Sequence, residues 1–332
     1  MKFVALTLLI ILLTLANIYI GSVSIPADEV TAILTGHESS VKAYNFIVID
    51  SRLPQALTAI VAGAALAISG LLLQTAFRNP LASPSLLGIT SGASLGVALV
   101  TLISGGTLAI GSFAIGGMAA VMGAAFVGSM ATMALLLLLS SLLRNDLLLL
   151  ITGVLLGYLV SSIITLLNFN ASATGIQSYI LWGMGTFSGL TLRNTGIFAA
   201  ITFVGLAIAA TLVKPLNLLQ LGSGYARSLG VNLPRVRNLL LLSTGLLTAA
   251  ATAYCGPVAF IGLAVPHITR IIFPTADHRV LLPATILTGS AVALLCNLIC
   301  VLPSSGLLPL NSVTPLIGVP VIIYVILTRS RH

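Results

Sequence analysis

Long apolar stretches dominate this chain, each of about 20 residues and each followed by a short polar connection. A helix rises about 1.5 Å per residue, so about 20 apolar residues cross the ~30 Å hydrocarbon core of a bilayer. The 332 residues are 58% hydrophobic and only 6% charged. A soluble domain of this size could not carry that composition on its surface without aggregating. The sequence therefore predicts an all-α, polytopic membrane protein.

We expect about ten membrane-spanning helices in a single transmembrane domain, residues 1–332. The approximate spans are 3–20, 56–76, 86–104, 113–139, 147–167, 195–213, 238–254, 257–273, 280–300 and 310–328. The first span lacks a small-x-small cleavage site, which favours a retained helix over a signal peptide. Ten crossings place both ends of the chain on one side of the membrane.

The distribution of positive charge predicts which side that is. Eleven of the fourteen Lys and Arg residues fall in loops and tails on the side of the N-terminus, and only Lys42, Arg52 and Arg193 fall on the other side. Positive residues are retained in cytoplasmic loops, so we expect both termini in the cytoplasm. This asymmetry explains the net charge of +8 without a nucleic-acid partner.

The three cysteines do not indicate a metal site. Cys255, Cys296 and Cys300 lie in apolar stretches with no histidine or acid near them in sequence. Small apolar side chains that fill space are the more frequent use of such cysteines. We expect no metal and no cofactor.

Three regions interrupt the apolar pattern. Residues 74–96 and 254–270 are rich in Gly and Pro, a pattern typical of transporters with internal repeats. Residues 214–238 form the longest polar inner segment, with glycine-containing turns on both sides of a short helix and several cations. This segment is either a cytoplasmic docking element or an ordinary inner loop that obeys the positive-inside rule.

The predicted helix 147–167 and its end carry polar side chains on roughly one face. These are Tyr158, Ser161, Ser162, Thr165 and Asn168. Such hydroxyls and amides either line an aqueous path or hold helices together. Gln74 presents the same alternatives. His267 follows a proline in an apolar run, where a structural role is favoured over titration or metal binding.

A series of short motifs follows one order along the chain from about residue 50 to 330. They are Arg52-Leu53-Pro54-Gln55, the run 63–70, Gln74, Arg78-Asn79-Pro80-Leu81-Ala82, Pro84, Leu87-Gly88, Leu221-Gly222, Ala226, Leu229-Gly230, Gly256-Pro257, Phe260-Ile261-Gly262-Leu263, Pro266-His267, Arg270, Asp277-His278-Arg279, Leu281-Leu282-Pro283, Val313-Thr314 and Leu316-Ile317-Gly318. Together they resemble the signature of the FecCD-type permeases of ABC importers for iron chelates and vitamin B12.

The resemblance implies a type II ABC importer permease in the inner membrane of a bacterium. Its partners would be a second permease subunit, two cytoplasmic ATP-binding subunits and an extracytoplasmic binding protein. The permease itself would not be an enzyme, and the chain contains no Gly-x-x-x-x-Gly-Lys-Ser/Thr motif. Because closed twofold dimers are the commonest oligomers, we expect the second permease subunit to be a copy of this chain.

The resemblance also implies roles for individual residues. The coupling helix that contacts the ATPase corresponds to Leu221, Gly222, Ser223, Tyr225, Ala226, Arg227, Leu229 and Gly230. Arg52 corresponds to an outer arginine that receives acids of the binding protein, with fixation of the outer helix end as the alternative. The turn 140–145, with Ser140, Ser141 and Asn145, corresponds to the cytoplasmic gate. The polar face at Tyr158, Ser162, Thr165 and Asn168, with Gln74, corresponds to the translocation path.

The chain departs from the family pattern at several charged positions. It has Gln55 for a second arginine and Ser223 for a glutamate, and it has Asn297 for an aspartate, Val301 for an arginine and Leu307 for a glutamate. Either Arg52 carries a larger share of docking here, or another surface substitutes for the missing charges.

Two classes of transporter remain open. An importer permease is favoured, because a secondary carrier usually buries ionisable residues in mid-membrane, and every Asp and Glu here falls in a predicted loop. Among substrates, family frequencies favour an iron chelate, siderophore or haem, over cobalamin.

Overall fold

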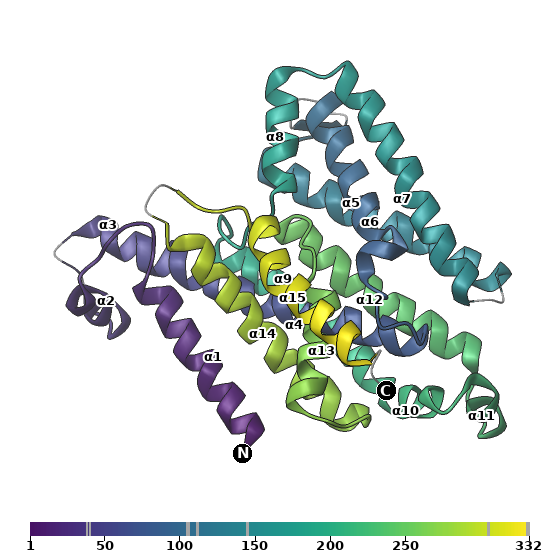
Figure 1. The fold of residues 1–332 in the computed structure, drawn as a ribbon. Coiled ribbons are helices and arrows are strands. Elements are labelled where there is room, and N and C mark those ends of the chain that lie inside the picture. Colours follow the sequence, from purple (N-terminus) through teal and green to yellow (C-terminus); the bar gives the residue numbers. More distant parts are fainter. Residues whose placement is uncertain are drawn as a thin grey trace.

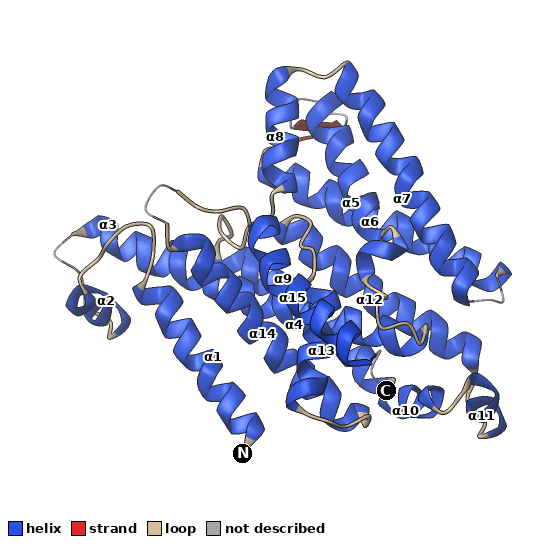
Figure 2. Ribbon diagram, viewed as in Figure 1, coloured by secondary structure: helices blue, strands red, loops and turns tan. Residues whose placement is uncertain are grey.

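The computed structural model describes residues 1–37, 39, 41–103, 107–110, 113–143, 146–303 and 306–329. Helices make up almost all of it (Figure 2), and one two-stranded hairpin is the exception. Seven helices are long and apolar enough to cross a membrane by length and composition. They are α1 (Lys2–Tyr19), α4 (Leu53–Ala76), α6 (Met118–Leu142), α7 (Asp146–Phe169), α9 (Leu192–Thr211), α12 (Leu233–Cys255) and α14 (His278–Val301).

Three further apolar helices occupy the other predicted spans. They are α5 (Ile89–Ala98) with its π-helical continuation Leu99–Ile103, α13 (Ile261–Ile272) and α15 (Leu310–Arg329). The remaining elements are α2 (Ala27–Leu34), α3 (Lys42–Asn45), a π-helical turn Phe46–Arg52, a 3-10 turn Pro84–Leu87, α8 (Ala173–Gly183), α10 (Val213–Gln220) and α11 (Ser223–Ser228). The all-helical membrane fold is confirmed, while the count of ten crossings stays a prediction.

Two local differences from the predicted spans have physical reasons. The span expected from residue 113 begins as a strand, because β1 (Thr107–Ile110) pairs antiparallel with β2 (Phe113–Gly116). Gly117 then takes a positive φ of 66°, and α6 starts at the next residue. The short helix α8 was not expected, because its sequence mixes polar and apolar residues without a long apolar run.

Helix α4 lies at the centre of the molecule, surrounded by α12, α13 and α14 (Figure 1). Its residues are almost all buried along the length of the helix. Glycines permit this crowding, because a Cβ at Gly63 would overlap the carbonyl of Gly289, and one at Gly70 would overlap the carbonyl of Gly262. Small residues at such crossings let helix backbones pack closely in a membrane.

The helices α5, α6, α7 and α8 stand together on one side of this central group (Figure 1). Gly92 and Gly128 bring α5 and α6 into backbone contact, and Gly245 of α12 fits against Met133 of α6. Helix α7 is only partly covered, since just 22% of its most apolar window is buried. A long helix with so little burial in one copy of the chain faces lipid, a partner or an aqueous space.

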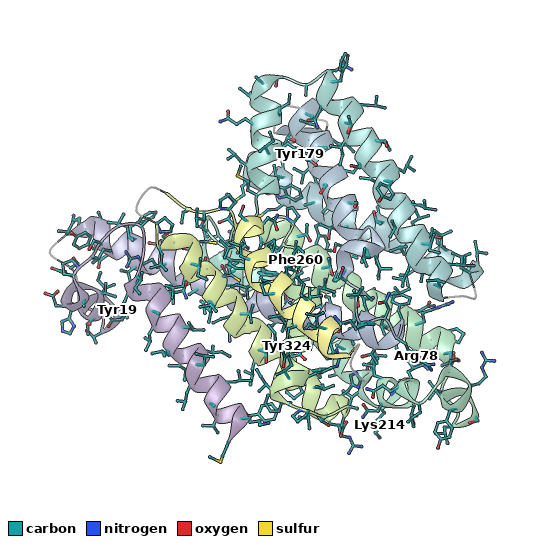
Figure 3. The ribbon with its side chains drawn as sticks, in the orientation of Figure 1. Tyr19, Arg78, Tyr179, Lys214, Phe260 and Tyr324 are labelled. Atoms are coloured by element: carbon teal, nitrogen blue, oxygen red, sulfur yellow. The ribbon has the colours of Figure 1, made fainter. Side chains whose placement is uncertain are left out.

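The two ends of the bundle carry different elements. At one end, Lys2 donates from its ammonium group to the carbonyl of Ile272 at 2.7 Å, and Gln220 of α10 donates to the carbonyl of Ala276 at 2.8 Å. Figure 3 places Arg78 and Lys214 at this end and Tyr19 at the opposite one. The chain start, the α13–α14 turn and α10 therefore share one face of the molecule.

Candidate coupling surface, gate and path

The segment between α9 and α12 folds into two short helices joined by glycine. Gly222 has a φ of 125° and Gly230 a φ of 83°, so a glycine with positive φ lies on each side of α11. Glycine adopts such angles without steric cost. The expected short helix between two glycine turns is therefore present, and it projects beyond the end of the bundle (Figure 1).

An apolar stripe covers the outer face of this segment. Leu221, Tyr225 and Leu229 recur every four residues, and they are 66%, 53% and 53% exposed. Arg227 and Ser223 are exposed beside the stripe. Only Tyr225 lies within α11, while Leu221 and Leu229 flank it at the two glycine-containing turns. Three large exposed apolar side chains in so short a segment are typical of a contact surface.

Ala226 lies on the inner face of the same helix. It is fully buried, its backbone N–H donates to the carbonyl of Gly222 at 2.8 Å, and its carbonyl accepts from Val231 at 3.0 Å. Its small side chain seats α11 against the rest of the segment. A contact role for Ala226 itself stays a prediction.

Hydrogen bonds tie the segment to the core helices. Arg78, which follows α4 and has a φ of 47°, donates to the carbonyl of Leu219 at 2.9 Å. Gln220 also contacts the ring of His278 at 3.0 Å, and the other ring nitrogen of His278 contacts Thr75 of α4 at 3.0 Å. These bonds join α10 to the ends of α4 and α14.

Asp277 forms the N-cap of α14. Its Oδ1 accepts from the backbone N–H of Arg279 at 2.9 Å and from the amide of Asn217 at 2.6 Å. These bonds, the one from Arg279 first, hold the pKa of the Asp277 carboxyl below its ordinary value. The Asp277-His278-Arg279 motif thus joins α10 to the start of α14.

The predicted gate turn is held by an arginine from α12. The guanidinium of Arg237 donates to the carbonyl of Ser140 and, at 3.2 Å, to the carbonyl of Leu143. These carbonyls end α6, so Arg237 supplies the positive charge and donors that a helix C-terminus lacks. Ser140 is buried and Ser141 is exposed, whereas Asn145 lies outside the described residues. A gate role for these residues stays a prediction.

The polar face of α7 is open to the surroundings in a single copy of the chain. Tyr158 is 70% exposed, Ser162 and Thr165 are exposed, and Asn168 is partly covered. The hydroxyls of Ser162 and Thr165 donate to helix carbonyls four residues earlier, at 3.0 Å and 2.9 Å. These bonds satisfy the donors and leave oxygen lone pairs on the exposed face.

Gln74 sits apart from that face, near the coupling segment. Its amide nitrogen donates to the carbonyl of Leu263 at 3.1 Å, and its oxygen accepts from Arg270 at 2.9 Å. It also borders a cavity of about 640 Å³ that it shares with Arg78 and Gln220. Its contacts support the helix-packing alternative, and its place in the path stays a prediction. His267 is buried, with Nε2 at 2.8 Å from the carbonyl of Pro80, and this contact supports its structural role.

Arg52 lies at the opposite end of the molecule and is 5% exposed. Its guanidinium donates to the carbonyls of Ile18 at 2.8 Å, Tyr19 at 2.9 Å and Val23. An added Cβ at Gly21 would overlap the guanidinium, so this glycine makes room for it. These contacts support the alternative in which Arg52 fixes the outer helix end. Docking by Arg52 stays a prediction.

Two of the departures from the family pattern contact each other, which sequence reasoning missed. The amide of Gln55 donates to Asn297 at 3.0 Å, and Asn297 donates to Asn17 at 2.7 Å. Asn17 in turn donates to the carbonyl of Leu294 at 3.1 Å. The changes at Gln55 and Asn297 therefore form one amide contact between α4 and α14, extended to α1. The signal available in the sequence was Asn17 itself, an amide within the apolar run of the first helix. The structure shows that it is buried.

Comparisons with known proteins agree with this arrangement. A model of the FecCD transport family matches residues 8–328. The vitamin B12 import system permease protein BtuC of Salmonella typhi is 35% identical over 332 residues, covering 98% of this chain and 95% of the relative. The BtuC of Salmonella paratyphi A strain ATCC 9150 is 36% identical over the same shares.

Two solved structures resemble the fold. One, described as an inward-facing conformation of a metal-chelate type ABC transporter, is 28% identical with a TM-score of 0.84 over 98% of both chains. The other, PsaBC from Streptococcus pneumoniae in complex with a Fab, is 14% identical with a TM-score of 0.54 over 82% of this chain and 90% of that chain. The second similarity shows the fold alone.

Proposed function

The chain belongs to the FecCD transport family of ABC importer permeases, and we propose that residues 221–230 are the surface through which it couples to ATPase subunits. The exposed stripe Leu221, Tyr225 and Leu229 carries this proposal. An ordinary polar loop would not display three large apolar side chains within nine residues. Burying such a side chain contributes about 1.5 to 3 kcal/mol, enough to anchor a partner at a small contact.

The connections of the segment supply a route for motion. From α10, which leads directly into α11, one set of bonds runs through Arg78 and His278 to α4 and α14. On the other side of α11, α12 carries Arg237, which bonds to the end of α6. A partner that pulls on α11 therefore acts on the gate turn and the central helix together. ATP hydrolysis belongs to separate subunits in this family.

Substitution of the stripe tests the proposal. Tyr225→Asp with Leu229→Asp should reduce co-purification of the ATPase subunit by more than about tenfold, which corresponds to ~1.4 kcal/mol. Tyr225→Phe with Leu229→Met keeps the apolar surface and should keep the association. Unchanged association in the Asp variant, with normal insertion of the protein in the membrane, would reject the coupling role of this face.

The second permease is proposed to lie against α7. This helix carries polar groups on an otherwise apolar, largely uncovered surface, and a closed twofold pair would enclose that face. An extracytoplasmic binding protein completes the assembly in this proposal, on the side of Arg52. The face with α10, α11 and Lys2 is proposed to be cytoplasmic, since Arg227, Arg235 and Arg279 are also on it.

We propose a metal chelate as the substrate, with cobalamin and iron chelates as the two candidates. The curated relatives named above are vitamin B12 permeases, and the solved structure at 28% identity is described as metal-chelate type. The preference for iron rested on family frequencies alone, and the relatives support cobalamin about as well. Uptake of labelled cyanocobalamin and of a ferric siderophore by the complete importer in vesicles, each in competition with the other, decides between them.

A further inference from the structure

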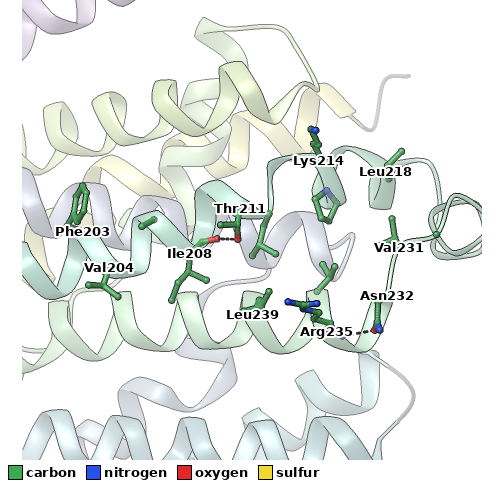
Figure 4. Close-up of a pocket in the computed structure, with 15 residues that line it drawn as sticks. Phe203, Val204, Ile208, Thr211, Lys214, Leu218, Val231, Asn232, Arg235 and Leu239 are labelled. Atoms are coloured by element: carbon green, nitrogen blue, oxygen red, sulfur yellow. Dashed lines mark hydrogen bonds between the residues drawn. The ribbon is translucent and has the colours of Figure 1, made fainter.

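A groove of about 890 Å³ runs along the outside of the molecule between α9, α10 and the start of α12 (Figure 4). Its lining residues are mostly apolar. They are Phe203, Val204, Ala207, Ile208, Thr211, Leu212, Lys214, Pro215, Leu218, Gly230, Val231, Asn232, Arg235, Val236 and Leu239. The groove is separate from the exposed stripe of α11 and from the polar face of α7.

The groove changes character along its length. At the α9 end it presents Phe203, Val204 and Ile208, and at the α10 end it presents Lys214 and Arg235. Both cations are exposed, and no carboxylate is among the lining residues, all of which the structure describes. The groove is therefore apolar at one end and positively charged at the other.

Its dimensions match one half of a bilayer. The lining residues of α9 extend from Phe203 to Thr211, eight residues on, which spans about 12 Å of helix at ~1.5 Å per residue. One leaflet of hydrocarbon is about 15 Å deep, half of the ~30 Å core. Lys214 follows three residues after Thr211, beyond the end of this apolar run.

We propose that this groove binds an anionic phospholipid, with an acyl chain along α9 and the phosphate headgroup between Lys214 and Arg235. Apolar side chains recognise the chain, and the two cations at the α10 end recognise the headgroup once the long side chain of Lys214, which points away from Arg235 in Figure 4, turns toward it. A zwitterionic lipid fills the same apolar part but gains little from the two cations. An acidic peptide gains from the cations but cannot fill an apolar groove at membrane depth.

The lipid would also brace the coupling segment. Lys214 precedes α11 and Arg235 follows it, so one headgroup bonded to both cations joins the two ends of the segment. Asn232, which caps α12 by accepting from the backbone N–H of Arg235 at 3.1 Å, holds the backbone of that cation in place. Occupancy of the groove would restrain α11 relative to α9 and α12.

Native mass spectrometry of the purified permease tests the proposal with phosphatidylglycerol and phosphatidylcholine of identical acyl chains. At about 1 kcal/mol per cation, two cations predict retention of phosphatidylglycerol about thirtyfold above phosphatidylcholine at low salt. Lys214→Gln with Arg235→Gln should abolish that preference. Arg193→Gln with Arg279→Gln removes two exposed cations outside the groove and should leave it intact.

A second variant tests the apolar part independently of charge. Ala207→Trp places a large ring in the groove and should reduce retention of both lipids, with the monodispersity of the protein as the measure of its folding. Equal retention of the two lipids by the wild-type protein would overturn the proposal. So would an unchanged preference in the Lys214→Gln, Arg235→Gln variant, or full retention in Ala207→Trp.

Discussion

At the scale of single residues, a few polar side chains hold the ends of apolar helices together. Arg237 ends α6, Asp277 begins α14, and Arg52 joins the end of α1 to the start of α4. Each bonds to main-chain groups that a helix end leaves without partners. By pairing these groups, the three side chains join the ends of neighbouring elements to one another.

Arg237 is expected to link the coupling segment to the gate turn. Arg237→Gln removes the charge and the paired donors, and hydrogen bonds to charged groups contribute about 1.5 to 3 kcal/mol each. We expect a lower thermal midpoint, together with ATP hydrolysis that no longer drives uptake. Arg237→Lys, which keeps the charge, should recover part of the coupling. If uptake per ATP in Arg237→Gln equals that of the wild-type protein, the link has no role in coupling.

Asp277 predicts a dependence of stability on pH. Its folded-state pKa lies below its unfolded value, which is about 3.9, so the ionised carboxylate contributes stability above that value. The contribution is lost as the pH falls through the folded-state pKa. Asp277→Asn keeps an oxygen for the N-cap but does not titrate. The thermal midpoint in detergent should therefore fall less steeply in Asp277→Asn than in the wild-type protein below about pH 4, and parallel curves would contradict this.

At the scale of elements, the amino-acid pattern predicts the long helices and misses what holds them in place. Apolar runs of about 20 residues place α1, α4, α7 and α14 within a few residues, because crossing a bilayer demands them. Helix α8 could not be predicted in this way, because it is short and mixes polar with apolar residues. The contact of Gln55 with Asn297 joins residues 242 apart in sequence, and periodicity carries no information about such pairs.

Helix α7 provides a test of the path at this scale. Ser162→Cys and Thr165→Cys should react with hydrophilic thiol reagents at rates that change when ATP and the binding protein are added. Ile163→Cys, which is also exposed but lies on another side of the same helix, should react slowly in all states. The native cysteines are buried and give little background. Equal, unchanging rates at all three positions would favour the helix-packing alternative for α7.

At the scale of the whole molecule, the chain has a firmly packed group of central helices and a side that little of the chain covers. The helices α4, α12, α13 and α14 share one hydrophobic core, whereas α7 contributes exposed polar and apolar residues with no counterpart in the described part of the chain. Sequence reasoning predicted the polar face from spacing. It could not determine how much of α7 stays uncovered, because that depends on the packing of all other helices.

The uncovered side of α7 predicts a symmetric pair. In a twofold dimer a residue near the axis approaches its own copy, so single cysteines along the α7 face should form disulfides between two identical chains. Thr165→Cys is expected to cross-link in native membranes under mild oxidation. Val204 lines the groove beside α9 and is 51% exposed, and Val204→Cys should not cross-link. Cross-linking at Val204 and none along α7 would place the second copy against α9, and the groove would then be an interface between subunits. Cross-linking along α7 alone would keep the groove open to the bilayer and enclose the hydroxyl-lined face between the two copies, where a substrate path belongs.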